Sequence, residues 1–268
     1  MTEQKPKKDA KPQRHAKKKA KTTSWGGVAH WYDTLLAGDD TYQVRVILPN
    51  LLRAMAIKKE ERILDLACGQ GFFARAFFKE GASVTGVDLG KQLIAIAKND
   101  SPKEVRYFAH SAEDLSIFPD GSFEKIAIVL SIQNIEAPHK VFKECARVLV
   151  PGGKLFLVLN HPAFRIPKAS AWGYDELSKT QYRHIDSYMS EIKATIEMNP
   201  SKKDGATTIS FHRPLQYYFK TLANSGFVVA RLEEWLSHRE SEKGPRREAE
   251  DKARKEIPLF LFLEVLKK

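Results

Sequence analysis

Strand-like apolar runs alternate with helical patterns along the first half of the chain, and this alternation constrains the fold more than any other feature. Between the runs lie helix-like stretches at 72–80, 90–99 and 138–149. The runs themselves cover 62–66, 83–88, 105–109, 124–130 and 154–159. Strands that are separated by helices pair in parallel. The pattern therefore predicts a doubly wound α/β domain, with a parallel sheet covered by helices on both faces.

The second half of the chain breaks this alternation. Residues 160–213 look irregular, with prolines at 162, 167 and 200. Helical spacing returns at 214–224, and strand-like runs follow at 226–232 and 257–265. Upstream of the alternation, 43–56 also has the spacing of an amphipathic helix. We therefore expect one domain over 25–268, with 160–213 as an insertion.

Positive charge is concentrated at the N-terminus. Residues 1–24 hold eight lysines and Arg14 against Glu3 and Asp9, so they carry +7 of the total net charge of +11 and leave +4 for the rest. They contain no Val, Ile, Leu or aromatic residue, so the sequence predicts a disordered lysine-rich tail. The tail is either a solubilising end or an arm that makes weak contact with RNA or another polyanion.

The cysteine content and the hydropathy of the chain indicate where in the cell the protein is located. Cys68 and Cys145 do not form a disulfide framework or a zinc spacing. No apolar run approaches the roughly 18 residues that span a bilayer, and the basic N-terminus lacks the apolar segment of a secretory signal. A cytoplasmic protein without a membrane span is the expectation.

The stretch ILDLACGQGFF, residues 63–73, joins the first predicted strand to the first predicted helix. Asp65 sits near the end of the strand, and Gly69 and Gly71 follow it. Glycines let a backbone pass close to a ligand, and the N–H groups of the next helix attract negative charge. Ligands bind at the carboxyl ends of strands in sheets of this kind. A ligand site is therefore expected here, although the glycine spacing alone also fits dinucleotide-binding proteins.

Three more motifs follow the glycine turn in order: VTGVDLG at 84–90, HSAEDLSIF at 110–118, and 130–158 with its Pro-Gly-Gly turn. With DLACGQG at 65–71, they resemble class I S-adenosylmethionine (SAM)-dependent methyltransferases, especially the ubiquinone and menaquinone (methyltransferase type 11) kind. The resemblance covers about residues 30–160. It implies a Rossmann-like, seven-stranded, mostly parallel sheet with an antiparallel last strand, which 257–265 is placed to supply.

The resemblance also implies SAM as the cofactor and a set of cofactor-binding residues. No metal ion is expected, because the methyl group of SAM is already activated and the sequence shows no clustered carboxylates. Asp65 either contacts the methionine part or only orients the glycine turn. An acid after the second strand accepts the ribose hydroxyls, and the third motif lines the adenine. The expected residues are Tyr32, Asp65, Ala67, Gly69, Gly71, Asp88, Leu89, Ser111, Ala112, Glu113 and Ser131. Ala67 replaces a glycine of the family pattern, and Ser111 replaces an aspartate. The alternatives are tight turns for the glycines, helix caps for the acids and a core position for Tyr32.

Candidates for contact with a methyl acceptor follow the fourth and fifth strands. Gln133 and Asn134 can hydrogen-bond an acceptor, and His161 is the first choice for a general base, with His184 and His212 as further candidates. Residues 161–219 hold nine of the chain's 27 aromatic residues, which favours a substrate-covering lid at 160–213. The alternative is that these rings pack the insertion onto the sheet.

The motifs together predict an enzyme that methylates a small molecule. A dehydrogenase on the same fold is the competitor, but the adenine segment and the final strand favour SAM. The Asn/Asp-Pro-Pro-aromatic segment of adenine- and glutamine-methylating enzymes does not occur after the fourth strand, where Ser131 to Asn134 stand instead. Two alternatives stay open: a methyltransferase for RNA or an RNA-associated protein that uses the basic tail, and a SAM-binding module without catalysis.

Overall fold

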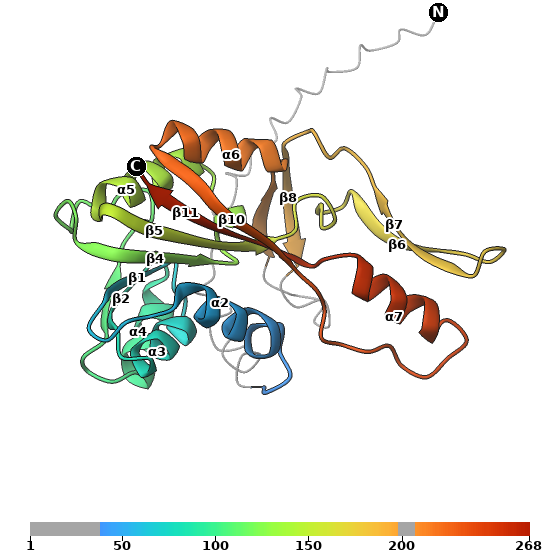
Figure 1. Ribbon diagram of the computed structural model, residues 1–268, viewed down its shortest axis with the longest axis horizontal. Coiled ribbons are helices and arrows are strands. Elements are labelled where there is room, and N and C mark those ends of the chain that lie inside the picture. Colours follow the sequence, from blue (N-terminus) through green and yellow to red (C-terminus); the bar gives the residue numbers. More distant parts are fainter. Residues whose placement is uncertain (1–37, 198–206) are drawn as a thin grey trace, which may run out of the picture.

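A seven-stranded sheet forms the centre of the protein in the computed structural model, which describes residues 38–197 and 207–268 (Figure 1). Its order is β10-β11-β5-β4-β1-β2-β3. β11 runs antiparallel to both of its neighbours, and the other pairs are parallel. The strands are β1 (Arg62–Leu66), β2 (Ser83–Asp88), β3 (Arg106–Ala109), β4 (Phe123–Val129), β5 (Leu149–Asn160), β10 (Phe227–Trp235) and β11 (Phe260–Lys267). The predicted fold class, including the antiparallel last strand, is confirmed.

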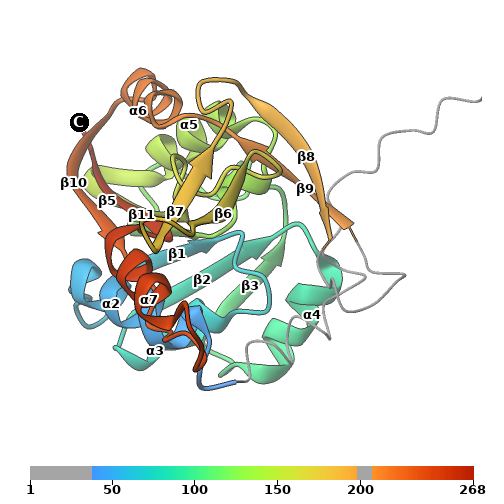
Figure 2. The same cartoon turned by 90° about the vertical axis from the view of Figure 1, so that its right-hand side faces the viewer.

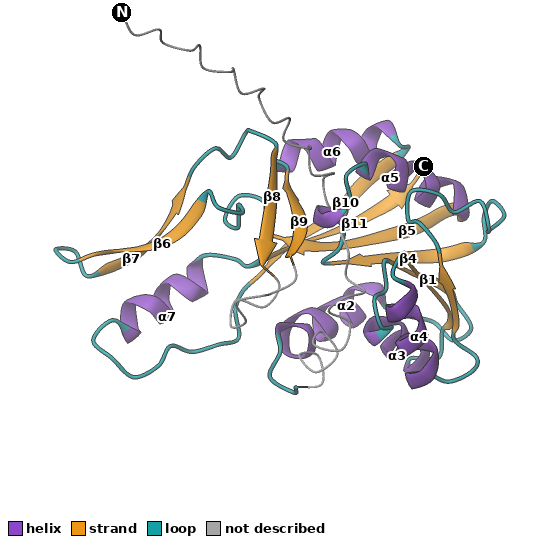
Figure 3. Cartoon of the chain, turned by 180° about the vertical axis from the view of Figure 1, so that it is seen from behind, coloured by secondary structure: helices purple, strands orange, loops and turns teal. Residues whose placement is uncertain are grey.

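Helices cover both faces of the sheet, as Figures 1 and 3 show. α2 (Leu48–Met55), α3 (Phe72–Lys79) and α4 (Lys91–Asp100) lie on one face, and α5 (Pro138–Val148) and α6 (Leu215–Asn224) lie on the other. β1 shows how the sequence divides the core: Ile63 packs in the first layer, while Leu64 and Leu66 pack in the second. No helix in the described ranges is long and apolar enough to cross a bilayer.

The N-terminal helical segment is less regular than its spacing predicts. Gln43–Ile47 form a π-helical turn, η2, which leads directly into α2. Pro49 lies in the first turn of α2 and has no N–H to donate to the preceding turn. A widened turn just before a proline satisfies the backbone in another way, and the hydrophobic spacing alone does not reveal it.

β5 begins earlier than the sequence predicts. The Pro-Gly-Gly turn, Pro151 to Gly153, precedes the predicted strand at 154–159, but in the structure these residues lie inside β5. Gly152 takes a left-handed φ of 72°, and the pairing with β4 shifts register between Phe123 and Lys125. The strand therefore accommodates the turn residues as an irregularity instead of ending at them.

Residues 160–213 contain two β-hairpins, so the expectation of an irregular segment is wrong. One hairpin pairs β6 (Ser170–Asp175) with β7 (Thr180–Ile185), and the other pairs β8 (Ile192–Glu197) with β9 (Thr207–His212). These strands alternate polar and apolar residues without a continuous apolar run, which made them hard to recognise. The β6–β7 hairpin packs against α7 (Arg247–Glu256), beyond the end of the sheet at which β5 finishes (Figures 1 and 2).

The order of the strands fixes where a ligand can bind. The chain builds β1, β2 and β3 in one direction across the sheet, and then returns to place β4 and β5 on the other side of β1. The switch point therefore lies between β1 and β4 at the carboxyl ends of the strands. The two hairpins and α7 lie at this end (Figure 2).

Candidate functional site

The turn after β1 has a left-handed backbone at three positions. Ala67, Gly69 and Gly71 have φ values of 59°, 57° and 80°. A side chain added at Gly71 would collide with the ring of Tyr107, whereas one added at Gly69 would meet nothing within 4 Å. Gly71 is therefore required by packing inside the protein, and Gly69 borders open space that a ligand can use.

Asp88, at the end of β2, accepts hydrogen bonds from two loops, the one after β1 and the one after β2. Its Oδ2 accepts a hydrogen bond from Gly69 N at 2.9 Å, and its Oδ1 accepts one from Gly90 N at 2.7 Å. Burial raises the pKa of this carboxyl, while the two backbone hydrogen bonds oppose the rise. The carboxylate thus positions the glycine turn, and its remaining lone pairs can accept further hydrogen bonds.

Asp65 is buried in the layer of the core that packs under α3. It is 1% exposed, and its Oδ2 has no hydrogen-bond partner within the described part of the chain. Burial raises the pKa of Asp65 to about 7, against the opposing hydrogen bond from the Ala74 backbone. Buried carboxylate oxygens are normally hydrogen-bonded, so the Oδ2 of Asp65 is expected to bind a group from outside the described part of the chain.

The segment after β3 lies beside Asp88. His110 N donates to Asp88 O at 3.0 Å, and the Ser111 hydroxyl accepts from Glu113 N at 3.1 Å. Ser111 therefore caps its own loop. Ala112 packs on the core layer under α5. Leu89, next to Asp88, is 67% exposed and offers an apolar surface beside these loops.

The loop after β4 turns amide and hydroxyl groups toward the same end of the sheet. Gln133 Nε2 donates to Leu130 O at 2.8 Å, and this bond holds the side chain. The Oε1 of Gln133 and the Oγ of Ser131 are buried and lack partners among the described residues. Asn134 is half-buried in the same short 3₁₀ turn, η3 (Ile132–Asn134), but its side chain does not line the cavity described next.

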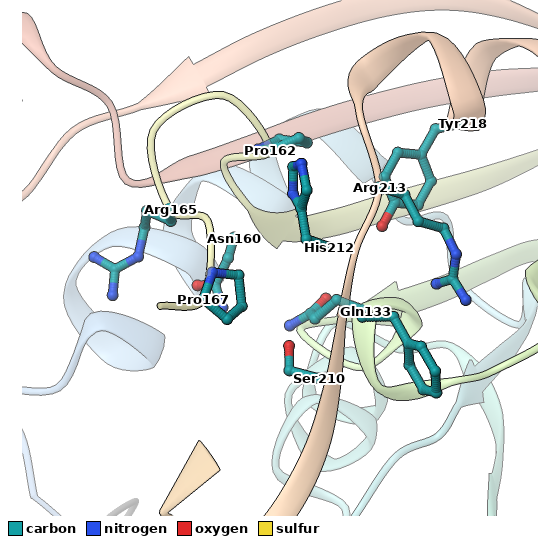
Figure 4. A pocket seen from close by; sticks show the side chains of 10 residues that line it. Gln133, Asn160, Pro162, Arg165, Pro167, Ser210, His212, Arg213 and Tyr218 are labelled. Carbon is teal, nitrogen blue, oxygen red and sulfur yellow. The ribbon is translucent and has the colours of Figure 1, made fainter. Parts of the chain in front are cut away.

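A small cavity opens beside Gln133 at the ends of β4 and β5 (Figure 4). Its lining combines these strand ends with the segment after β5 and with β9. The residues are Gln133, Asn160, Pro162, Arg165, Pro167, Ser210, Phe211, His212, Arg213 and Tyr218. β4 neighbours β1 in the sheet, so this cavity and the glycine turn share one edge.

His161 is buried with both ring nitrogens engaged. Nε2 lies 2.8 Å from Glu234 Oε1, and Nδ1 accepts from Ala163 N at 3.2 Å. Burial lowers the pKa of His161, although Glu234 opposes the shift. With no free nitrogen, His161 ties β5 to β10, and this geometry does not favour it as a base.

Sequence reasoning placed some residues here and missed others. Tyr32 lies outside the described residues. The structure brings Asp65, Gly69 and Asp88 together at the ends of β1 and β2, and it places Gln133 after β4, the other neighbour of β1. Tyr107 and Ser210 were not predicted. Tyr107 packs against Gly71 and Ser210 lies on β9, and neither residue belongs to a sequence motif.

Comparisons with known proteins agree with this geometry. Residues 64–157 match the family model described as a methyltransferase domain. The chain is 36% identical over 99 residues to a ubiquinone biosynthesis O-methyltransferase of Xanthomonas oryzae, and 34% over 100 residues to that of Coxiella burnetii. These matches cover 36% and 37% of this chain and 41% and 43% of the relatives. The chain therefore matches about two fifths of their length.

The chain carries a class I SAM-dependent methyltransferase domain. A solved SAM-dependent methyltransferase from Mesorhizobium loti superposes with a TM-score of 0.64 at 26% identity, over 81% of this chain and 96% of that one. A glycopeptide N-methyltransferase, MtfA, solved with SAM, gives 0.54 at 17% identity over 82% and 92%, and shows the fold alone. SAM is the cofactor of this family, as the sequence predicted.

The residues of the methyltransferase domain fit SAM. SAM carries a positive charge on sulfur and another on its amino group, and the orphaned Oδ2 of Asp65 lies beside the glycine turn. The open space at Gly69 leaves room for a ligand, and Asp88 stands at the next strand end with lone pairs to spare. Within the described ranges, no three His, Cys, Asp or Glu side chains are grouped to hold a metal ion.

Proposed function

We propose that the protein transfers the methyl group of SAM to a small-molecule acceptor bound in the cavity beside Gln133. The observation that carries the proposal is the place of this cavity. It opens at the ends of β4 and β5, and β4 is next to β1, which leads into the glycine turn. Two ligands at these places would lie side by side across the switch point of the sheet.

SAM supplies an activated methyl group on a sulfonium, so the protein's task is to align the acceptor and exclude water. Asp65, Gly69 and Asp88 would hold the cofactor. Gln133 offers a carbonyl oxygen to an acceptor: its amide nitrogen is held by Leu130 O, and its Oε1 has no partner among residues 38–197 and 207–268. The names of the ubiquinone biosynthesis O-methyltransferases support a small-molecule acceptor.

The insertion at 160–213 covers the acceptor in this proposal. Pro162, Arg165 and Pro167 reach the cavity from the segment after β5, and Ser210 and His212 reach it from β9. These residues come from both sides of the insertion, so the acceptor site cannot form without it. A short cover of this kind limits the size of the acceptor and its exposure to water.

The proposal includes a cytoplasmic location, which the two buried free thiols, Cys68 and Cys145, fit. Fractionation of cells that express the full chain would test it.

The experiment that tests the function supplies methyl-labelled SAM and a whole-cell extract to the purified full-length protein. Label is then counted in the small-molecule, RNA and protein fractions. Asp88→Ala serves as the control, because it removes the acceptor of two backbone hydrogen bonds at the cofactor loops. Label in the small-molecule fraction that Asp88→Ala fails to produce is the expected result.

Two other outcomes decide against the proposal. Label in RNA or protein makes the lysine-rich residues 1–24 the delivery arm for a macromolecular substrate. Binding of SAM with no label in any fraction favours a SAM-binding module without catalysis.

A further inference from the structure

The inward face of β9 is polar, which is unusual for a buried strand. Thr208, Ser210 and His212 alternate along β9 and are 1%, 5% and 4% exposed. Buried strand faces are normally apolar, because polar groups lose their hydration there. The Oγ1 of Thr208 also lacks a hydrogen-bond partner within the described part of the chain. A buried polar group without a partner needs a polar ligand or water to pair with it.

This face of β9 is directed at the acceptor cavity. Ser210 and His212 line it together with Gln133 and Asn160, and Figure 4 shows these four side chains on one side of the strand. Arg213 points to the other side, where its Nη2 donates to Ile135 O at 3.1 Å and Glu136 O at 2.8 Å. These bonds fasten the end of β9 to the loop after β4, so His212 keeps a fixed position beside the cavity.

The hydrogen bonds of His212 define its tautomer. Nε2 lies 2.8 Å from Tyr188 O, and a carbonyl oxygen only accepts, so Nε2 carries the proton. Nδ1 is then left with a lone pair. Tyr188 is itself held, because its hydroxyl accepts from Leu215 N at 3.0 Å. A carbonyl that orients a histidine and leaves the other nitrogen basic is the arrangement of a general base.

The surroundings of His212 keep it neutral. Burial lowers the pKa of His212, and the hydrogen bond to Tyr188 O only partly opposes this. The other ionisable groups that line the cavity are Arg165, Arg213 and the Tyr218 hydroxyl, with the Tyr188 ring packed against His212. No carboxylate belongs to the lining formed by the described residues. Arg213 lies on the other side of β9 and pairs with Glu191, so burial is the main cause that keeps the imidazole neutral, and the Nδ1 lone pair accepts no hydrogen bond from the described residues.

We propose that His212 is the general base of this methyltransferase and that its acceptor is a hydroxyl compound. The inference rests on the proposed function. A hydroxyl is a weak nucleophile until its proton leaves, whereas a neutral amine needs no base. As Nδ1 takes the proton, the acceptor oxygen bonds to the methyl carbon and the electron pair of the broken C–S bond stays on sulfur. The products are a methyl ether, S-adenosylhomocysteine and an imidazolium that returns its proton to water.

The first test is His212→Gln in the full chain. A glutamine amide can still donate to Tyr188 O, but it has no basic nitrogen. With methyl-labelled SAM and the small-molecule fraction of a cell extract, we expect product formation to fall about 10²- to 10⁴-fold. The Kd for SAM, measured by calorimetry, should stay within about twofold, since His212 lies outside the cofactor loops. The control is His139→Gln, an exposed histidine on α5, which should keep the wild-type rate.

A second test uses only the wild-type protein and therefore does not depend on how a variant folds. In ¹⁵N-histidine NMR of the full chain, His212 should be the Nε2–H tautomer with a pKa below 6.5. The kcat of the wild type at saturating SAM should fall in acid through the same pKa. Asp65 and Asp88 also titrate at this edge, so the acid limb must coincide with the NMR value of His212 to support the proposal.

The outcomes separate the inference from the proposed function. If the wild type labels no small molecule, the proposed function fails and the inference fails with it. If the wild type and His212→Gln label the small-molecule fraction equally, only the inference fails. An Nδ1–H tautomer in the NMR spectrum, or a kcat that is flat between pH 5 and 8, also overturns the inference, even if His212→Gln misfolds.

Discussion

At the scale of single residues, the buried Asp65, the half-buried Asp88 and a glycine turn form the candidate cofactor site. Asp88 is satisfied by two backbone N–H groups, whereas Asp65 keeps an orphaned oxygen. Two acids thus stand at adjacent strand ends: one positions the loops, and the other has one oxygen without a partner in the described part of the chain. A cationic cofactor offers the missing charge.

The pH dependence of stability tests the environment of Asp65. Its pKa is about 7 in the folded state, raised by burial, and about 3.9 in an unfolded chain. Between these values the folded state binds more protons, so the contribution of Asp65 to stability falls as pH rises and is lowest above about pH 7. Asp65→Asn removes this titration. From pH 5 to pH 8, the wild type should lose about 2–3 kcal/mol relative to Asp65→Asn in urea unfolding without SAM.

The wild type and Asp65→Asn both contain Asp88, so the titration of Asp88 cancels when their stabilities are subtracted. Equal slopes of stability against pH for the wild type and Asp65→Asn would show that Asp65 ionises normally in the folded state.

Two glycines of one turn should respond differently to the same substitution. Gly69→Ala and Gly71→Ala both place a side chain at a left-handed φ, which costs about 1–2 kcal/mol. Gly71→Ala also collides with Tyr107, so its unfolding free energy should fall by about 2–4 kcal/mol. Gly69→Ala should lose little more than the backbone cost, but its affinity for SAM should drop at least about tenfold. Urea unfolding measures the stability of both variants, and calorimetry measures their affinity for SAM. If Gly69→Ala binds SAM as tightly as the wild type, Gly69 does not belong to the cofactor site.

At the scale of elements, the β6–β7 hairpin and α7 support each other away from the sheet. Arg246, at the start of α7, lies 4.3 Å from the ring centre of Tyr174 and pairs with Glu176. Arg183 of β7 stacks on Trp172 of β6 in the same way, at 5.2 Å. Arginine–aromatic stacking thus joins segments that are about seventy residues apart in the chain.

Loss of one such contact should loosen α7 without changing the sheet. Arg246→Ala removes both the stacking and the ion pair, which together are worth about 1 kcal/mol at this exposure. Amide hydrogen exchange in Arg247–Glu256 should accelerate about fivefold, while β5 and β11 keep their protection. Lys252→Ala, an exposed position on the same helix, is the matched control. Equal exchange in the two variants would show that Arg246 does not hold α7.

At the scale of the whole molecule, most of the net positive charge lies in a different part of the sequence from the candidate site. Residues 1–24 carry +7 of the net +11, and the cavity and cofactor loops lie in the other part of the chain. A protein of residues 25–268 should therefore keep its rate of small-molecule methylation within about twofold. Its retention on a heparin column should fall, because polyanion affinity follows the number of released counterions. A large loss of rate on the same extract would assign residues 1–24 to catalysis.

The sequence by itself determined the parts of this protein that local chemistry dictates. Apolar runs and helical spacing specified β1, β2, β4 and the helices between them, because a strand buried on both faces is apolar throughout and a helix that covers a sheet is apolar on one face. The glycine turn was predicted for a similar reason, since a backbone that passes close to a ligand needs glycine, whereas Asp88 was predicted through the resemblance to the methyltransferase family.

Only the tertiary structure decided the rest, because it depends on which distant segments meet. His161 was the first choice for a base, but Glu234, 73 residues away, occupies its Nε2. Tyr107 determines that Gly71 serves packing and leaves Gly69 to face open space. The polar side of β9 becomes meaningful only when β9 is folded against the loop after β4, where His212 joins Gln133 at one cavity. Contacts between segments so far apart follow from packing, and no local pattern in the sequence encodes them.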